Sequence, residues 1–205
     1  MLENELRDFR LGGAELPPAQ KARFKAIQEE LAAAATRFEE NLLDATNAFA
    51  LYVENAAELA GIPQDAVQAA REAAAKDGKP GWKFTLRMPS YLPVMQYAEH
   101  RPLRAALYRA YVTRAAEFGK PEWDNTPLIG QILRLRREAA RMLGFANYAE
   151  ESLSTKMAGT PQQALDFLRE LAARAKPYAE RDLRELEEFA RAELGLEALE
   201  AWDVP

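Results

Sequence analysis

The stretch PPAQKARFKAIQEELAAAATRFEENLLDATNAF, residues 17–49, decides the fold class of this chain of 205 residues. Its large apolar residues recur every three or four positions, and alanines fill the gaps, which is the period of one helix face. The apolar positions are Phe24, Ile27, Leu31, Phe38, Leu42 and Phe49. The two leading prolines suit a first helical turn, where missing N–H groups cost little. The stretch therefore predicts one helix of more than about 25 residues, which must pack on a partner through a single apolar stripe.

Two short segments after this helix depart from the helical period. FALYVEN, Phe49–Asn55, and WKFTLRM, Trp82–Met88, alternate with period two and are rich in β-branched and aromatic residues. Between them we expect a turn at Gly61–Pro63 and an alanine-rich helix at Gln64–Lys76. We interpret the two segments as a small antiparallel pair that needs helices to pack on, because two strands alone are only marginally stable.

The chain returns to the helical period from Ser90 onward. Ser90 is the expected N-cap of the first helix there, and proline starts and glycine stops delimit helices at Pro102–Gly119 and Thr126–Gly144. Thr160 is the expected N-cap of a last, long helix, which Pro177 should kink or divide. The predicted fold class is mainly α: a helical bundle with one small two-stranded β element.

Composition and charge limit the class of protein. The net charge of −5 argues against a broad phosphate-binding surface, so we expect no nucleic-acid partner. The absence of cysteine excludes disulfides and cysteine-based metal sites. No segment approaches the roughly 20 apolar residues of a membrane span, and the acidic N-terminus lacks the basic start of a signal peptide. We therefore expect a cytoplasmic protein that makes no contact with membranes.

The residues of this chain do not form a recognisable catalytic or metal-binding constellation. His100 is the single histidine, whereas a H-E-x-x-H zinc helix needs two. Ser90, Ser152 and Ser154 lie outside any G-x-S-x-G nucleophile elbow, so we interpret His100 as a helix-junction residue rather than a general base. Glycine-rich phosphate loops are also absent. We predict no catalytic residue, no metal ligand and no cofactor for this chain.

One polar cluster, between Arg101 and Arg114, lies on the helix expected there. Arg104, Tyr108 and Tyr111 are spaced three to four residues apart and so can share one face. Arginine and tyrosine along a face suit a peptide backbone, a carboxylate or an RNA strand. We favour the alternative of an amphipathic helix whose arginines reach past apolar surface to solvent. Arg104, Tyr108 and Tyr111 nevertheless define the candidate peptide-contact face of this chain.

Three long stretches carry a resemblance to a known family. They are LRDFRLGGAELP (Leu6–Pro17), MPSYLPVMQYAEHRPLRAALYRAYVTRA (Met88–Ala115) and WDNTPLIGQILRLRREAARMLGFANYAEESLSTKMA (Trp123–Ala158). In order and spacing they resemble the thimet oligopeptidase and oligopeptidase A family of zinc metallopeptidases, and are closest to its bacterial oligopeptidase A branch. The run LGFANYAEESLSTKMA is long and irregular enough to be specific. The resemblance covers essentially the whole chain.

The resemblance implies a longer parent enzyme, a zinc-dependent oligopeptidase whose two mostly helical halves flank a deep channel. Its zinc would be held by a H-E-x-x-H helix and a downstream glutamate, C-terminal to the matched region, so no residue here inherits a catalytic or zinc-binding role. Residues 1–98 would be the later part of the N-terminal helical region with the β pair. Residues 99–205 would be the helices leading into the catalytic region. The chain is then expected to be an internal fragment that forms part of the channel wall and is inactive alone.

The fragment interpretation also predicts partners. These are the missing catalytic half of the same polypeptide, short peptide substrates in the parent, and further copies of the chain through exposed apolar surface. Trp202, in the final stretch EALEAWDVP, is expected to pack on residues of the missing half. The alternative is a stand-alone helical module that binds a protein or peptide through the Arg101–Arg114 helix.

Overall fold

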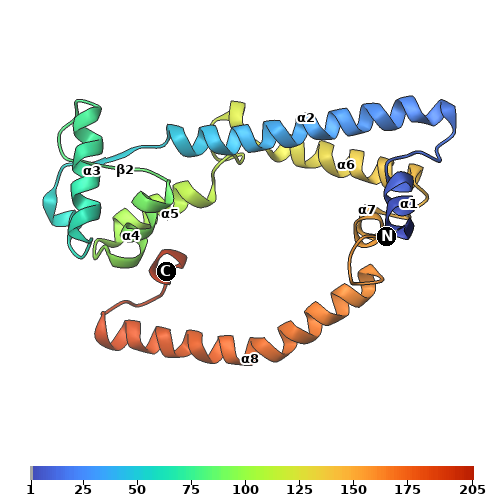
Figure 1. The fold of residues 1–205 in the computed structure, drawn as a ribbon. Coiled ribbons are helices and arrows are strands. Elements are labelled where there is room, and N and C mark those ends of the chain that lie inside the picture. The colour runs from blue at the N-terminus through green and yellow to red at the C-terminus, as the bar shows by residue number, and fades with distance from the viewer. Residues whose placement is uncertain (1) are drawn as a thin grey trace. The chain divides into compact units, whose positions relative to one another are not determined.

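The computed structural model describes residues 2–205, which form a mainly helical fold (Figure 1). The helices are α1 (Leu2–Leu11), α2 (Pro18–Ala48), α3 (Gln64–Lys76), α4 (Met88–Tyr97), α5 (Arg101–Val112), α6 (Thr126–Met142), α7 (Tyr148–Leu153) and α8 (Pro161–Glu193). The strands are β1 (Leu51–Val53) and β2 (Trp82–Phe84), and the short 3-10 turns are η1 (Ala56–Leu59), η2 (Pro121–Trp123) and η3 (Ala201–Asp203). The predicted fold class is confirmed. None of the described helices is long and apolar enough to cross a membrane.

Two helix ends show where local sequence signals succeed and fail. The hydroxyl oxygen of Thr160 accepts a hydrogen bond from the backbone N–H of Gln163 at 3.2 Å, as expected of the predicted N-cap. Ser90 is not an N-cap, because α4 already begins at Met88. The earlier start is possible because α4 has a proline in its first turn, where a missing N–H costs little. The Ser90 hydroxyl instead accepts a hydrogen bond from Thr85 N–H at 2.9 Å.

The chain divides into two compact units. Unit 1 comprises Met1–Phe38 and Thr126–Glu185, and unit 2 comprises Glu39–Asn125 and Leu186–Pro205. Helix α8 is uninterrupted, so Pro177 does not divide it. The predicted boundary at residue 98 concerns the regions of a parent enzyme and stays a prediction.

In unit 1, the first part of α2 runs alongside α6 (Figure 1). The core between them consists of Leu16, Phe24, Ile27, Leu135 and Ala139. At the edge of this core, Nε and Nη2 of Arg23 each donate to one carboxylate oxygen of Glu138 at 2.7 Å. These hydrogen bonds lower the pKa of the Glu138 carboxyl. Because both side chains are nearly half exposed, we attribute the packing of these helices to the apolar core rather than to the ion pair.

In unit 2, the β ribbon packs against α3, α4 and α5 around a larger core. The strands pair antiparallel, with Leu51 opposite Phe84 and Val53 opposite Trp82, so that Val53 and Phe84 are buried on one face. The core continues through Leu86, Val94, Met95, Leu103 and Leu107. On the other face of the ribbon, Tyr52 and Lys83 both donate to one carboxylate oxygen of Asp77 at 2.6 Å. Each face of this short ribbon is therefore held by helices or their ends.

Gly81 is required by the close approach of the two strands. Its φ of +81° lies in the left-handed region, and a Cβ atom would lie 2.1 Å from the carbonyl oxygen of Val53. Gly78, in the same connection, also has a positive φ, of +68°, but a Cβ atom there would meet nothing within 4 Å. A side chain at Gly78 would therefore cause backbone strain alone, whereas one at Gly81 would cause both strain and a steric clash.

We predict that Gly81→Ala lowers the free energy of unfolding by roughly 3 kcal/mol or more, because strain and overlap add. Gly78→Ala is the matched control and should cost only about 1–2 kcal/mol, the strain of a left-handed alanine. Urea denaturation of the two variants and the unchanged chain measures both values. Equal losses at the two positions would contradict the close approach at Gly81.

Candidate functional site

The polar face of α5 carries the candidate binding residues named from the sequence. The helix begins after His100, with Pro102 in its first turn, and its inner side buries Leu103 and Leu107 in the core of unit 2. It ends at Val112, so the predicted extent to Gly119 is wrong, because the chain turns left-handed at Ala115, where φ is +49°. The remaining side is available for polar contacts. In the structure, this side meets the last residues of the same unit.

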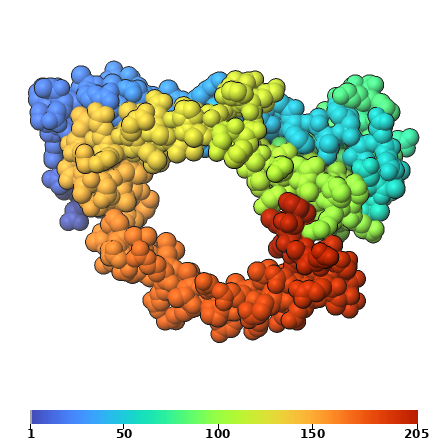
Figure 2. Space-filling view, turned by 180° about the vertical axis from the view of Figure 1, so that it is seen from behind, coloured from blue at the N-terminus to red at the C-terminus, as the bar shows by residue number. Residues whose placement is uncertain are grey.

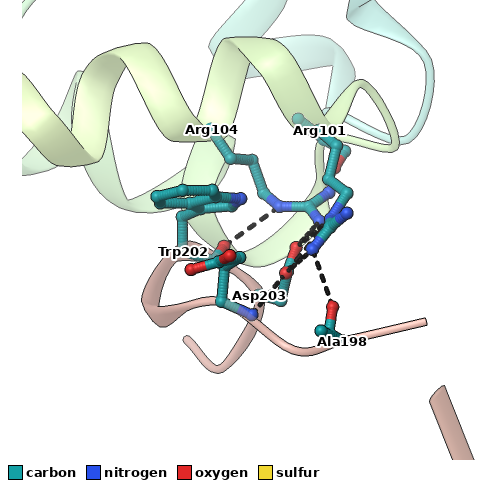
Figure 3. A network of polar contacts seen from close by, with 7 residues as sticks. Arg101, Arg104, Ala198, Trp202 and Asp203 are labelled. Atoms are coloured by element: carbon teal, nitrogen blue, oxygen red, sulfur yellow. Dashed lines mark hydrogen bonds and ion pairs between the residues drawn. The ribbon is translucent and has the colours of Figure 1, made fainter. Parts of the chain in front are cut away.

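Arg101 and Arg104 share one carboxylate, that of Asp203 in η3 (Figure 3). Arg101 binds it in a bidentate manner, donating from Nε to Oδ1 at 2.9 Å and from Nη2 to Oδ2 at 2.5 Å. Arg104 donates from Nη2 to Oδ1 at 2.6 Å. Figure 2 shows the result as the red C-terminal residues lying against the green residues around α5. The two arginines thus fasten the chain terminus of unit 2 to α5.

The remaining N–H groups of the two guanidiniums bind backbone carbonyls. Arg101 donates from Nη2 to the carbonyl oxygen of Ala198 at 3.0 Å, and Arg104 donates from Nε to that of Trp202 at 3.1 Å. Arg104 also donates from Nη1 to the carbonyl oxygen of Ala98, at the end of α4. Arg104 therefore links α4, α5 and η3. A lysine could not reproduce these contacts, because its single ammonium lacks the planar fork of a guanidinium.

The Asp203 carboxylate is almost fully buried and fully engaged. Its side chain is 2% exposed, against 14% for Arg104 and 34% for Arg101. The backbone N–H of Glu200 supplies a further donor to Oδ2, at 3.0 Å. The hydrogen bonds from Arg101, with those from Glu200 N–H and Arg104, outweigh the cost of burial and lower the pKa of Asp203 to about 2. A buried carboxylate with this many donors stays ionised at neutral pH.

The tyrosines of α5 have aromatic partners within unit 2. The ring of Tyr108 meets that of Trp202 edge to face, with centroids 6.2 Å apart, and Tyr111 stacks on Tyr91 at 4.3 Å. Trp202 packs against the core of unit 2, so it has partners within this chain, and its expected packing on residues of the missing half stays a prediction. The sequence could not show that Trp202 meets Tyr108, because the two residues lie far apart in the chain. The proposed contact of Arg104, Tyr108 and Tyr111 with a peptide stays a prediction.

His100 and the serines show no catalytic arrangement. The Nδ1 atom of His100 lies 3.6 Å from a carboxylate oxygen of Glu58. Each serine is engaged elsewhere: Ser90 with Thr85 N–H, Ser152 with the Lys156 ammonium, and Ser154 with the carbonyl of Glu151. Across residues 2–205, no group of three or more His, Asp or Glu side chains is placed to hold a metal ion. The residues present therefore do not fit a zinc centre, and we assign no metal chemistry to them.

Asp203 is the residue of this cluster that sequence reasoning missed. It is separated from Arg101 by 102 positions, and a lone aspartate near the end of a chain has no distinctive spacing. The one local signal is the capping arrangement of η3, in which the Glu200 side chain accepts from Asp203 N–H and the Asp203 side chain accepts from Glu200 N–H. That signal predicts a short turn, but gives no information about which arginines the carboxylate meets.

We predict that Asp203→Asn lowers the free energy of unfolding by roughly 3 kcal/mol, because it leaves two partly buried guanidiniums without their counter-charge. This loss is at the low end of the range for breaking a buried ion pair, because the Arg101 side chain is about one third exposed. Asp44→Asn is the control, because Asp44 is exposed and forms no ion pair among the described residues. Urea denaturation measures both, and a loss at Asp203 no larger than that at Asp44 would contradict the role of the ion pairs.

The same pair sets a pH dependence. The pKa of Asp203 falls from an ordinary 3.8 to about 2 on folding, so its stabilisation is complete above pH 3.8 and is lost as the pH falls toward 2. The lowered pKa corresponds to about 2 kcal/mol. Asp203→Asn should therefore flatten the dependence of unfolding free energy on pH between about pH 4 and 2. An unchanged slope would show that other carboxyl groups dominate acid unfolding.

Comparison with known proteins gives these contacts a context. Residues 94–205, more than half of the chain, match the family model described as Peptidase family M3. Oligopeptidase A of Haemophilus influenzae is 48% identical over 205 residues, which are 99% of this chain and 30% of that relative. Oligopeptidase A of Salmonella typhimurium is 46% identical over the same shares, and the probable cytosolic oligopeptidase A of Arabidopsis thaliana is 39% identical over 100% of this chain and 30% of its own length. The chain thus spans about 30% of the length of these relatives.

Proposed function

This chain belongs to peptidase family M3, and we propose that the protein it represents is a zinc-dependent oligopeptidase that hydrolyses short peptides in the cytoplasm. The observation that supports this most directly is the 48% identity to oligopeptidase A, which extends along 99% of the chain. The similarity therefore involves both units and the connections between their elements, not one helix. The name of the plant relative, which includes the word cytosolic, agrees with the proposed location.

Within that enzyme, we assign this segment a scaffold role. Its described residues do not form a donor set for a metal ion, so the residues that bind zinc and activate water would lie outside this sequence. What the segment supplies is a fixed surface: α5 is held on one side by the apolar core and on the other by the ion pairs with Asp203. Such a surface would form part of the wall that limits which peptides reach the metal, with Arg104, Tyr108 and Tyr111 as the proposed contact face.

We expect the isolated chain to cleave no peptide. The measurement is hydrolysis of a quenched fluorescent peptide of about ten residues, with zinc supplied, using the Haemophilus influenzae oligopeptidase A as positive control. The relative should cleave the peptide and this chain should not, because the chain lacks the second histidine of a H-E-x-x-H helix. Zinc-dependent cleavage by this chain would overturn the scaffold role. A gene that continues in frame past codon 205 into that motif would support it.

Helix α8 indicates where the rest of such an enzyme would pack. From Leu165 to Glu185, a stretch that belongs to unit 1, every residue is exposed, and the one buried residue of the whole helix is Ala190. The stretch nevertheless carries large apolar side chains, among them Leu165, Leu168 and Leu171, each about half exposed. Because a helix is stabilised chiefly by packing of its apolar face, such a face needs a partner.

We propose that the remainder of the same polypeptide covers this face. The relatives are about three times as long as this chain, so most of their residues lie outside it. Leu168, Leu171 and Leu183 lie on one side of α8, while acidic and basic side chains, such as Glu170 and Arg174, pair on the other. A face of this composition fits an intramolecular packing surface.

In the absence of that remainder, the isolated chain should self-associate through the same face. We predict that sedimentation shows dimers or larger species at micromolar concentration, and that Leu168→Glu with Leu171→Glu restores a monomer. The control is Ala173→Glu, on the opposite side of the helix, which should leave association unchanged. A strictly monomeric unmodified chain would contradict the proposal.

A further inference from the structure

A small surface pocket in unit 2 is separate from the ion pairs described above. Its volume is about 250 Å³, and its walls are mostly apolar: Ala45 and Phe49 at the end of α2 and just after it, Leu86, Ala110 on α5, and Trp123 in η2. This volume lies below the range of roughly 300–1,000 Å³ usual for drug-sized ligands. The pocket can therefore take a group about as large as one amino-acid side chain.

Two cations line the same pocket, and neither forms an ion pair with Asp or Glu among residues 2–205. They are Arg114 and Lys120. The guanidinium of Arg114 lies 3.6 Å from the centre of the Tyr111 ring, and the Lys120 ammonium lies 4.5 Å from that of Trp123. Arg114 also donates from Nε to the carbonyl of Tyr111 at 2.8 Å, which fixes its orientation. Aromatic rings hold both cations but do not neutralise them.

The backbone at the pocket is strained. Ala115, which also lines it, has a φ of +49° and is the only non-glycine residue of the described chain with a positive φ. Its carbonyl accepts a hydrogen bond from Asn125 N–H at 3.0 Å, so the surrounding connection maintains this conformation. An alanine in the left-handed region costs roughly 1–2 kcal/mol, and residues of this kind cluster at ligand-binding positions.

We propose that this pocket binds a carboxylate carried next to an apolar group. The two cations provide the charge that a carboxylate needs, and the apolar walls exclude charged or large polar neighbours. The C-terminal residue of a peptide with an aliphatic side chain has this chemistry, as does a short fatty acid. That a peptide end is the natural source rests on the proposed peptidase function, whereas binding itself does not depend on it.

The test uses NMR titration of the isotopically labelled chain with N-acetyl-leucine. The chain has three tryptophans, so three indole N–H signals are expected, and Trp123→Phe assigns the one in the pocket. The Trp123 signal should shift with saturation, while those of Trp82 and Trp202 serve as internal controls outside the pocket. N-acetyl-leucinamide, which lacks the carboxylate, should bind at least tenfold more weakly. Acetate, which lacks the apolar group, should also bind at least tenfold more weakly.

Substitutions locate the binding charge. Lys120→Gln and Arg114→Gln should each weaken N-acetyl-leucine at least tenfold, and Lys120 is exposed, so its replacement leaves the fold intact. Lys79→Gln is the matched control, because Lys79 also lies over a ring, that of Tyr52 at 3.8 Å, but does not line the pocket. It should leave binding unchanged.

Two further outcomes decide between sources and overturn the proposal. Hexanoate binding as tightly as N-acetyl-leucine would support the carboxylate chemistry and identify the source as an aliphatic acid rather than a peptide. Weaker binding of hexanoate would favour the peptide end. No shift of the Trp123 signal, or equal binding of the amide, would overturn the site. Because binding is read directly, this result is independent of whether any protein containing this chain cleaves peptides.

Discussion

The ion pairs of Asp203 with Arg101 and Arg104 are the constraint on which the rest of unit 2 depends. A carboxylate that is 2% exposed must be compensated, because burying an isolated charge costs far more than one domain can supply. Compensation here comes from two guanidiniums and one backbone N–H, and each guanidinium also binds a carbonyl of the same terminal segment. Since removing one partner leaves the others buried without a counter-charge, these contacts specify one position for the segment.

This requirement extends into the apolar core. Arg104 reaches Asp203 from the outer side of α5, while Leu103 and Leu107 of the same helix are buried in the core with residues of the β ribbon and α4. Its contact with the carbonyl of Ala98 at the same time satisfies an end of α4 that would otherwise lack a partner. One arginine thus links a helix end, a helix face and a distant turn. The edge-to-face contact of Tyr108 with Trp202 lies beside this cluster and adds apolar area to it.

The fold followed from sequence patterns because those patterns are local. The helical period of residues 17–49, the period of two around Leu51 and Trp82, and the limits of α3 each depend on neighbours within a few residues. The misplaced cap at Ser90 has the same origin, since two competing local signals lay two residues apart. The Asp203 contacts escaped prediction because they join positions about 100 residues apart, and no local period encodes such a pairing. The pocket at Trp123 was missed for the same reason, since its walls come from several separate segments.

Whether an arginine or lysine has a carboxylate partner within the chain distinguishes structural residues from candidates for ligand binding. Arg101 and Arg104 donate hydrogen bonds to Asp203 within the chain, so they have a structural role in addition to any contact with a peptide. Arg114 and Lys120 are held in place by aromatic rings but form no ion pair with a carboxylate of residues 2–205, and the strained Ala115 lies beside them. A cation that is held in one orientation but has no counter-charge can still form a favourable ion pair with an external ligand, and little conformational freedom is lost when it does so. By the same reasoning, the apolar side chains on one face of α8 in unit 1, which are exposed among the described residues, support the proposal that this face is a packing surface.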